Sequence, residues 1–419
     1  MAIARRVRTP LPLIPCLTLA CAALLLAACE DKQSPAPPAE VEARPAAVRF
    51  EPIAFADLPG WAEDDPRPAL AAFRRSCAGL AKAPDERAVG PDGLAGTVAD
   101  WRAPCAEIEV LGGAGGGAGG GDQALRALLE RGFVALSVVG DEGPEGTITG
   151  YYEPELNGAA SPSETHRWPL YRLPGDLVRV DLGRFRADLD GQQILGRVDG
   201  DSRLVPYFTR AEIDGGALDG RGLELLWLDD PTDVFFLQVQ GSGRIRLADG
   251  SLRRVGFAGS NGLDYTSIGK AMLAEGLIDG SQASAQGIQA WLRDNPEQAP
   301  AVMQRNARFI FFREIDGEGP IGAQGVALTA GRSLAVDSAH LPLGAPVWLD
   351  TSWPGSDRPL RRLVVAQDKG AAIKGAVRGD LFWGSGAEAL EQAGRMHQRG
   401  RFYLLLPSAV AERLRAPAS

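Results

Sequence analysis

The spacing of apolar and polar residues divides the chain into helical and strand-like segments. Apolar positions recur at helical spacing in 68–80 and 123–131, which predicts two amphipathic helices. Period-two alternation predicts a strand over 234–240 and a β-hairpin over 245–257 that turns at Asp249-Gly250. Short strands at close spacing with few helices favour a mainly β fold of the barrel type over a doubly wound sheet. Further helices are expected over 266–277, 283–293, 300–306 and 387–396, and further strands over 147–152, 308–313, 345–349, 362–366 and 402–406.

The first 28 residues have the pattern of an export signal. Three arginines precede an apolar run over 11–27, which ends in Leu26-Ala-Ala-Cys29 and resembles a bacterial lipoprotein cleavage site. Lipidation of Cys29 would anchor the protein to a membrane without spanning it. A simple secretory signal or a short membrane helix is the alternative. Residues 29–50 are rich in Pro, Ala and Glu, so beyond the lipidated cysteine we expect a disordered tether.

Two of the five cysteines fall in the predicted folded part. Cys16 and Cys21 leave with the signal and Cys29 carries lipid, so Cys77 and Cys105 remain. An even pair in an oxidising compartment predicts a disulfide, with two buried free thiols as the alternative.

Charge and composition argue against several classes of function. The signal contains three arginines and no acidic residue, so its removal lowers the net charge from −9 to −12. An acidic protein of this kind is not expected to bind nucleic acid. The three histidines, at 166, 340 and 397, are too scattered for a histidine metal site. We therefore expect no metal and no cofactor.

The candidate chemistry lies near the C-terminus. Asp368 and Asp380 flank a segment rich in Gly and Ala that contains Lys374, and a third aspartate, Asp337, lies upstream. Carboxylates move protons, and glycines let a ligand approach the backbone closely. Two aromatic residues follow Asp380, and aromatic faces stack on sugar rings. This composition indicates chemistry on a sugar or a neutral polyol.

Asp380 is the strongest candidate acid. It precedes Leu-Phe-Trp, and apolar neighbours would raise the pKa of its carboxyl group by desolvation. If Lys374 lies close by, its positive charge would lower the pKa of the Asp380 carboxyl group. Asp368 and Asp337 are either catalytic partners or acceptors for backbone N–H groups in strand–turn connections.

Aromatic and amide side chains supply candidate contacts to substrate. Tyr151, Tyr152 and Trp383 are expected to stack on sugar rings, and for Phe382 core packing is an equal alternative. On the predicted strand, Gln238 and Gln240 share one face and could both bond sugar hydroxyls. Buried structural amides are the alternative for this pair.

Six runs of residues, taken together, resemble the membrane-bound lytic murein transglycosylase A family. They span about residues 145–406 in order, so their combination is more specific than any single run. The chain departs from the family pattern at Lys369 and Ala371, beside the candidate site, and at Ala307. The first two departures put the geometry of that loop in doubt. The runs are Gly150–Pro154, Phe236–Gly243, Asn261–Gly269, Asn306–Glu314, Leu328–Asp337 and Asp368–Gly384.

The resemblance implies a fold of two domains. A double-psi β-barrel domain, 51–155 plus 305–410, would be interrupted by a smaller β-domain over 156–304, with a substrate groove between them. The chain would pass from one domain to the other near Gly150 and return near Asn306.

The resemblance also implies an activity and roles for residues. Asp380 falls on the catalytic acid, and Asp337 and Asp368 fall on the other two aspartates. Glu153, Ser242 and Lys374 are further candidate contacts to substrate. The reaction would be exo-acting cleavage of the β-1,4 bond between N-acetylmuramic acid and N-acetylglucosamine, with a 1,6-anhydro end and no water consumed. Endo-acting cleavage stays open. The alternatives are a hydrolase that uses Asp368 with Asp380 and a non-catalytic glycan-binding lipoprotein.

The expected partners are peptidoglycan glycan strands and a membrane, with a cell-wall enzyme complex as a further candidate. The expected location is the periplasmic face of the outer membrane, with the inner membrane as the alternative.

Overall fold

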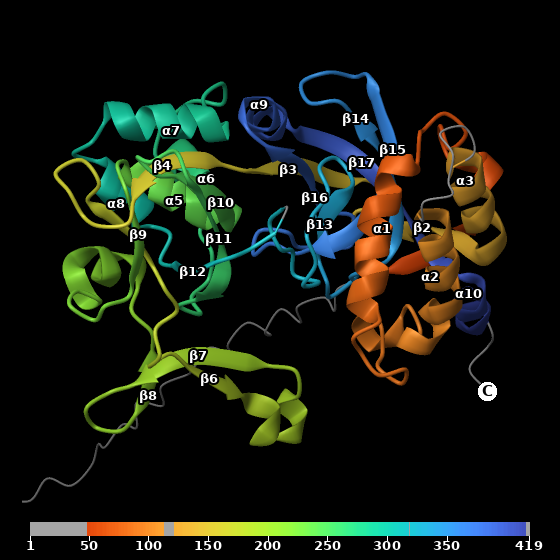
Figure 1. Cartoon of the computed structure of the whole chain (residues 1–419), viewed down its shortest axis with the longest axis horizontal. Helices are drawn as coiled ribbons and strands as arrows, with labels where there is room; N and C mark the ends of the chain where they lie inside the picture. The colour runs from red at the N-terminus through yellow and green to blue at the C-terminus, as the bar shows by residue number, and fades with distance from the viewer. Residues whose placement is uncertain (1–47, 113–120, 318, 416–419) are drawn as a thin grey trace, which may run out of the picture. The chain divides into compact units, whose positions relative to one another are not determined.

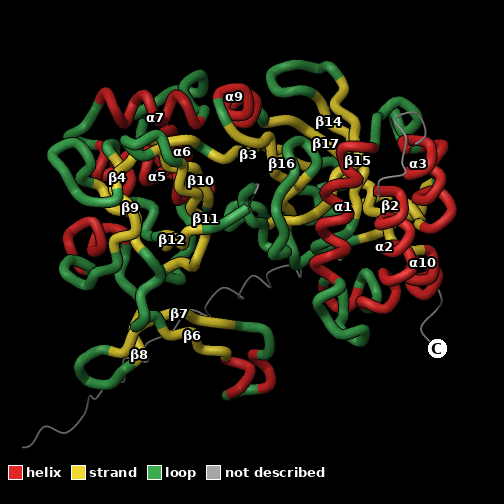
Figure 2. The backbone as a smooth tube through the Cα atoms, viewed as in Figure 1, coloured by secondary structure: helices red, strands yellow, loops and turns green. Residues whose placement is uncertain are grey.

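A computed structural model describes residues 48–112, 121–317 and 319–415 (Figures 1 and 2). The predicted signal, Cys29 and most of the predicted tether lie outside these residues. Within them the chain forms seventeen strands and ten α-helices, so the prediction of a mainly β fold is confirmed. No helix in these ranges is long and apolar enough to cross a membrane.

Six strands pair in a ring. Their order is β17-β14-β15-β13-β16-β3, and β3 pairs back with β17. The middle of β15, Leu363 to Ala366, is buried on both faces, which is why this segment reads as an unbroken apolar run. The double-psi crossing remains a prediction. The ring strands are β3 (Gly146–Glu153), β13 (Ser333–Val336), β14 (Pro346–Ser352), β15 (Pro359–Asp368), β16 (Gly379–Ser385) and β17 (His397–Pro407), and β1 (Arg49–Ile53) and β2 (Phe133–Val139) extend the sheet beyond β17.

Helices cover this sheet, as Figure 1 shows for α1 to α3 and α10. A disulfide joins Cys77 in α1 to Cys105 in α2, with an S–S distance of 2.04 Å and a Cα–Cα distance of 5.4 Å, which is the pairing predicted from the sequence. Helices α1 and α3 are confirmed, but α2 has no clear apolar stripe and contains Pro104, so its pattern gave no signal. The helices are α1 (Arg67–Leu80), α2 (Val98–Gly112), α3 (Gly121–Gly132), α9 (Ala387–Arg395) and α10 (Ser408–Arg415).

The segment between β3 and β13 contains a second sheet and a third. The second has the order β12-β11-β10-β4-β9-β5, and its β10–β11 hairpin was predicted. The third contains β6 (Val178–Asp181), β7 (Gln193–Val198) and β8 (Leu204–Pro206). The second sheet contains β4 (Glu155–Ala159), β5 (Trp168–Tyr171), β9 (Glu224–Leu228), β10 (Ser242–Arg246), β11 (Leu252–Ser260) and β12 (Ile310–Glu314), and the helices of this segment are α4 (Arg210–Glu212), α5 (Pro231–Gln240), α6 (Ile268–Ala274), α7 (Ala285–Asp294) and α8 (Ala299–Met303).

The strand predicted over 234–240 is wrong, because these residues belong to helix α5. The side chain of Asp230 accepts a hydrogen bond from the Thr232 backbone N–H at 2.8 Å, and Pro231 begins the helix. An N-cap aspartate followed by proline is a helix-start signal that outweighs the short alternation after it. On a helix, residues two apart lie about 200° apart, so Gln238 and Gln240 do not share a face.

Two predicted boundaries also shift. Strand β1 begins at Arg49, so the last two residues of the predicted tether pair with β2. Strand β12 pairs with β11 in the second sheet, so the chain leaves that sheet after Glu314 and not near Asn306. The buried Phe311 and Phe312 explain the second shift, because their side chains pack in the cores of the inserted segment.

Candidate active site

Asp380 lies in the ring strand β16, between β3 and β13. In the register of these strands it is opposite Thr149 on one side and Ala335 on the other. The Thr149 hydroxyl donates a hydrogen bond of 2.7 Å to Oδ1 of Asp380. Its neighbours Gly379 and Leu381 are buried while Asp380 is partly exposed, as strand alternation requires. The sequence had placed Asp380 at the end of a loop, but the ring strand holds it.

The surroundings of Asp380 keep it protonated more readily than an ordinary aspartate. Burial raises the pKa of its carboxyl group to about 6, and the nearby charge of Asp368 acts in the same direction. The Thr149 hydrogen bond and the charge of Arg378 oppose this rise in pKa. A carboxyl group that titrates near 6 can both give and take a proton under mildly acidic to neutral conditions.

Asp368, at the end of β15, is enclosed by hydrogen-bond donors. Its Oδ1 accepts from the backbone N–H groups of Ala323 at 2.8 Å and Lys369 at 2.9 Å, and its Oδ2 accepts from the Tyr151 hydroxyl at 2.9 Å. Burial raises the pKa of Tyr151 well above its ordinary value, so this hydroxyl stays a donor. The Tyr151 ring contacts the buried Phe382, with ring centroids 5.2 Å apart.

Asp337 is buried and bonds to backbone. Its Oδ1 accepts from the Ala339 N–H at 3.1 Å and its Oδ2 from the Gly375 N–H at 2.9 Å. Asp337 therefore holds the segment that links Asp368 to Asp380. The contacts of Asp337 and Asp368 fit the alternative in which both serve as acceptors for backbone groups. Within the described residues, Asp380 alone of the three has a single hydrogen bond and no backbone donor.

Tyr152, in β3, contacts Gln240, the last residue of α5. The Tyr152 backbone N–H donates to Oε1 of Gln240 at 3.3 Å. Tyr152 lines a cavity of about 460 Å³ whose lining also includes Asp233, Arg293 and Leu390. Burial, with the charge of Asp233, raises the pKa of Tyr152 to about 12.

Three of the predicted contact residues have partners within the protein. Glu153 is 2% exposed and pairs with Arg254 at 2.9 Å. Gln238 is buried and accepts a hydrogen bond of 2.6 Å from the Arg210 guanidinium. Trp383 is partly buried, and its indole N–H contacts the sulfur of Met396 at 3.3 Å.

The other two predicted contacts remain accessible. Ser242, in β10, is partly exposed, and Lys374 is exposed on the segment between Asp368 and Asp380. Sequence reasoning missed Thr149 and Arg378, which both act on Asp380. Alternation around the buried Ile148 places Thr149 on the opposite face, but only the pairing of β3 with β16 brings it to Asp380.

Comparison with known proteins assigns the chain to a family. The model of the MltA specific insert domain matches residues 147–313, and the model of the 3D domain matches residues 332–406. The chain belongs to the membrane-bound lytic murein transglycosylase A family. All three aspartates fall in the second match, and Thr149 and Tyr151 fall in the first.

Relatives and solved structures of the MltA family agree with this assignment. Membrane-bound lytic murein transglycosylase A of Vibrio cholerae is 30% identical over 275 residues, which cover 64% of this chain and 67% of that protein. A structure of the membrane-bound lytic murein transglycosylase from Agrobacterium tumefaciens is 35% identical, with a TM-score of 0.76, and the match covers 87% of this chain and 99% of that one. The structure of Escherichia coli MltA with bound chitohexaose is 25% identical, with a TM-score of 0.59, and covers 86% of this chain and 91% of that one.

Replacing Thr149 with Val should shift the pH dependence of this MltA family member. The hydroxyl stabilises the charged form of Asp380, so its loss should raise the pKa of the carboxyl group above 6. An activity that needs protonated Asp380 falls as pH rises through this pKa. In a plot of kcat/KM against pH, the decrease on the alkaline side (the falling limb) should therefore shift to higher pH by roughly one unit. Thr149→Ser keeps a hydroxyl and should leave the limb in place. An unchanged limb in Thr149→Val would contradict the role of this hydrogen bond.

Proposed function

We propose that this chain is a lytic transglycosylase that cleaves the β-1,4 bond between N-acetylmuramic acid and N-acetylglucosamine in peptidoglycan and leaves 1,6-anhydromuramoyl ends. The observation that carries the proposal is Asp380, which is partly exposed, bonded only to Thr149 within the described residues, and raised in pKa to about 6. Family membership and the relatives' names support the same reaction class.

In the proposed reaction Asp380 acts first as acid and then as base. Protonated Asp380 donates its proton to the glycosidic oxygen, and the bond from that oxygen to C1 of the muramoyl residue breaks. The C6 hydroxyl of the same residue then attacks C1 to form the C1–O6 bond, and its proton passes to the Asp380 carboxylate. The acid is regenerated and no water is consumed. Because the nucleophile belongs to the substrate, its proximity supplies much of the rate.

The contacts of Asp368 support a mechanism with one carboxylate. Most glycosidases need a second carboxylate that activates water or attacks C1. Asp368 is the nearest candidate, but its oxygens already accept hydrogen bonds from Tyr151, Ala323 and Lys369. We therefore assign Asp368 to positioning the segment before Asp380 and not to activating water.

The same proposal includes a membrane anchor and a polymeric substrate. Lipidation of Cys29 would hold the protein at the periplasmic face of the outer membrane, with glycan strands within reach of the tether. The relatives' description as membrane-bound supports attachment to a membrane. A location at the membrane would also allow association with a cell-wall enzyme complex.

Mass spectrometry of the products tests the reaction. Purified murein sacculi are digested with the protein from Glu30 onward, and the released muropeptides are analysed at their muramoyl ends. We expect ends that are lighter than reducing ends by one water molecule, because closure is intramolecular. Reducing ends would indicate hydrolysis, and binding without release would indicate a glycan-binding lipoprotein.

A further inference from the structure

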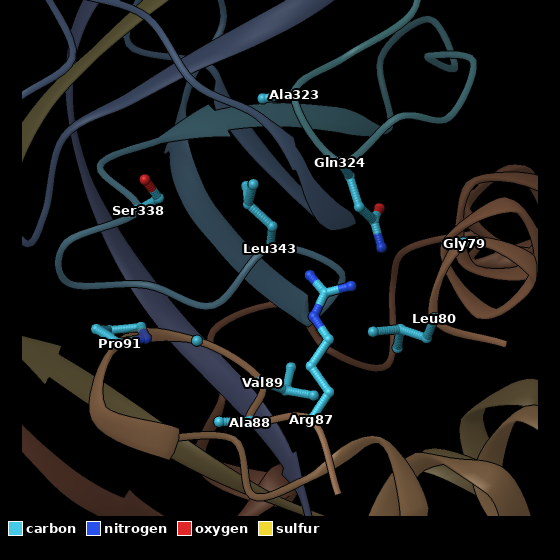
Figure 3. Close-up of a pocket in the computed structure, with 11 residues that line it drawn as sticks. Gly79, Leu80, Arg87, Ala88, Val89, Pro91, Ala323, Gln324, Ser338 and Leu343 are labelled. Atoms are coloured by element: carbon cyan, nitrogen blue, oxygen red, sulfur yellow. The ribbon is translucent and has the colours of Figure 1, made fainter. Parts of the chain in front are cut away.

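A pocket separate from Asp380 lies where the end of α1, the loop after it and two loops of the ring meet. Its volume is about 360 Å³ (Figure 3). Each residue that lines it belongs to 79–91 or 323–343, so the inserted sheets contribute none. Arg87 is the one charged side chain among the lining residues of this pocket. The lining is completed by Gly79, Leu80, Ala88, Val89, Gly90, Pro91, Ala323, Gln324, Ser338 and Leu343.

The guanidinium of Arg87 is available to a ligand. Figure 3 shows it pointing into the pocket, between Gln324, Leu343 and Leu80. Among the residues that the structure describes, no acidic side chain pairs with Arg87 and no hydrogen bond engages its guanidinium. A guanidinium presents a planar fork of donors that matches a carboxylate, and Leu80 and Leu343 offer apolar contact beside it. The pocket is thus suited to a carboxylate next to a short aliphatic group.

The loop that carries Arg87 is held in place. The Arg87 N–H donates to the Pro84 carbonyl at 3.2 Å, and the Arg87 carbonyl accepts from the Val98 N–H at 2.9 Å. Arg102 pairs with Asp85 at 2.8 Å. The disulfide between α1 and α2 ties the two helices that flank the loop. A binding group fixed before the ligand arrives loses less conformational entropy on binding.

The walls of the pocket are the segments that hold the aspartates. Ala323 lines the pocket, and its N–H donates to Asp368 at 2.8 Å. Ser338 also lines it and follows Asp337, which holds the Gly375 N–H at 2.9 Å. A group bound in the pocket would therefore lie beside the segment that leads to Asp380.

From these observations we propose that the Arg87 pocket binds a carboxylate of the peptide attached to the muramoyl residues, and so favours strands that carry peptides. This inference rests on the proposed function, since it concerns the same substrate. Each muramoyl residue carries this peptide through a lactyl group on C3, and the peptide contains acidic residues with short aliphatic ones. These are the chemical groups that the pocket can recognise.

Kinetics on two forms of the substrate test the proposal. Arg87→Gln is compared with the unchanged protein on peptide-bearing glycan strands and on strands from which an amidase has removed the peptides. We expect kcat/KM to fall about tenfold on peptide-bearing strands, through KM, and to stay unchanged on bare strands. Lys82→Gln removes the same charge from the same exposed loop, outside the pocket, and should match the unchanged protein on both. Equal losses on both substrates, or no loss on either, would overturn the proposal.

A binding measurement separates this proposal from the proposed function. Isothermal titration of an isolated stem tetrapeptide needs no catalysis, so its result holds even if the protein cleaves nothing. We expect binding to the unchanged protein and to Lys82→Gln, and weakening by about tenfold in Arg87→Gln. No binding to the unchanged protein, or equal binding to Arg87→Gln, would reject the pocket as a peptide site. Glycan cleavage with normal products would in that case leave the proposed function intact.

Discussion

Replacing Asp380 with Asn should lower the turnover of peptidoglycan by roughly 10³-fold or more while leaving the fold intact. An amide of nearly the same shape cannot release the proton that the leaving oxygen requires or take up the proton of the attacking hydroxyl, and general acid–base groups contribute about 10²–10⁴-fold each. Release of muropeptides from sacculi measures the effect. Asp357→Asn, at an exposed aspartate in the same matched domain, serves as the control and should keep full activity. Near-normal turnover in Asp380→Asn would contradict the assignment of the acid.

The same variant should not lose stability. The folded-state pKa of Asp380 is about 6, above its ordinary value of 3.8, so folding favours the protonated form. The contribution of this group to the free energy of unfolding is present below pH 4 and is lost as pH rises through 6. An amide does not titrate, so its contribution to the free energy of unfolding does not change over that pH range. Asp380→Asn should therefore be more stable than the unchanged protein at pH 8 by roughly 1–2 kcal/mol. Thermal unfolding at pH 4 and pH 8 checks this difference, which should vanish at the lower pH.

Removing the carboxylate of Asp64 by substitution with Ala should destabilise the protein by about 3–5 kcal/mol. Arg332 is 7% exposed and donates to both oxygens of Asp64, at 2.9 and 3.0 Å. The variant would leave the buried guanidinium without the carboxylate to which it donates, and the Leu363 N–H would lose its acceptor at 3.0 Å. Since Arg332 directly precedes β13, the loss of this ion pair should destabilise the ring of strands. Chemical denaturation measures the free energy of unfolding.

The neighbouring Asp65 provides the matched control. Its side chain pairs with Arg67 at 2.7 Å, but both side chains are about half exposed. Asp65→Ala should therefore cost only about 1 kcal/mol, because solvent already screens this pair. Similar losses in the two variants would mean that the burial of Arg332 does not govern its contribution.

The sequence predicted the strands of the ring better than the contacts among its side chains. Residues 363–366 and 402–406 form apolar runs because both faces of β15 and β17 are covered there, and such runs are visible in the local sequence. Helix α5 was misread because its aromatic and β-branched residues resemble a strand, while the decisive Asp230-Pro231 signal lies before the run.

The site was predicted in part for a similar reason. The three aspartates stand out by composition, and the structure brings Asp368 near enough to Asp380 to raise the pKa of its carboxyl group. Nothing in the sequence around Thr149 or Arg87 indicates a functional role for either residue. Thr149 reaches Asp380 across 231 positions of sequence, and Arg87 faces a pocket whose other walls come from 323–343. Only the pairing and packing of distant segments assign a role to such residues.

Closure of the ring has a consequence for the order of folding. Strand β3 pairs with both β16 and β17, which lie more than 200 residues later, so these pairs must wait until almost the whole chain is available. Strands β4 and β12, near the two ends of the inserted segment, belong to one sheet, and formation of that sheet shortens the loop that the ring must close. Asp380 and Thr149 can therefore meet only when the residues on both sides of the inserted segment are available. A nascent or truncated chain would lack the assembled acid, so the ability to cut glycan would arise only once the complete chain has folded.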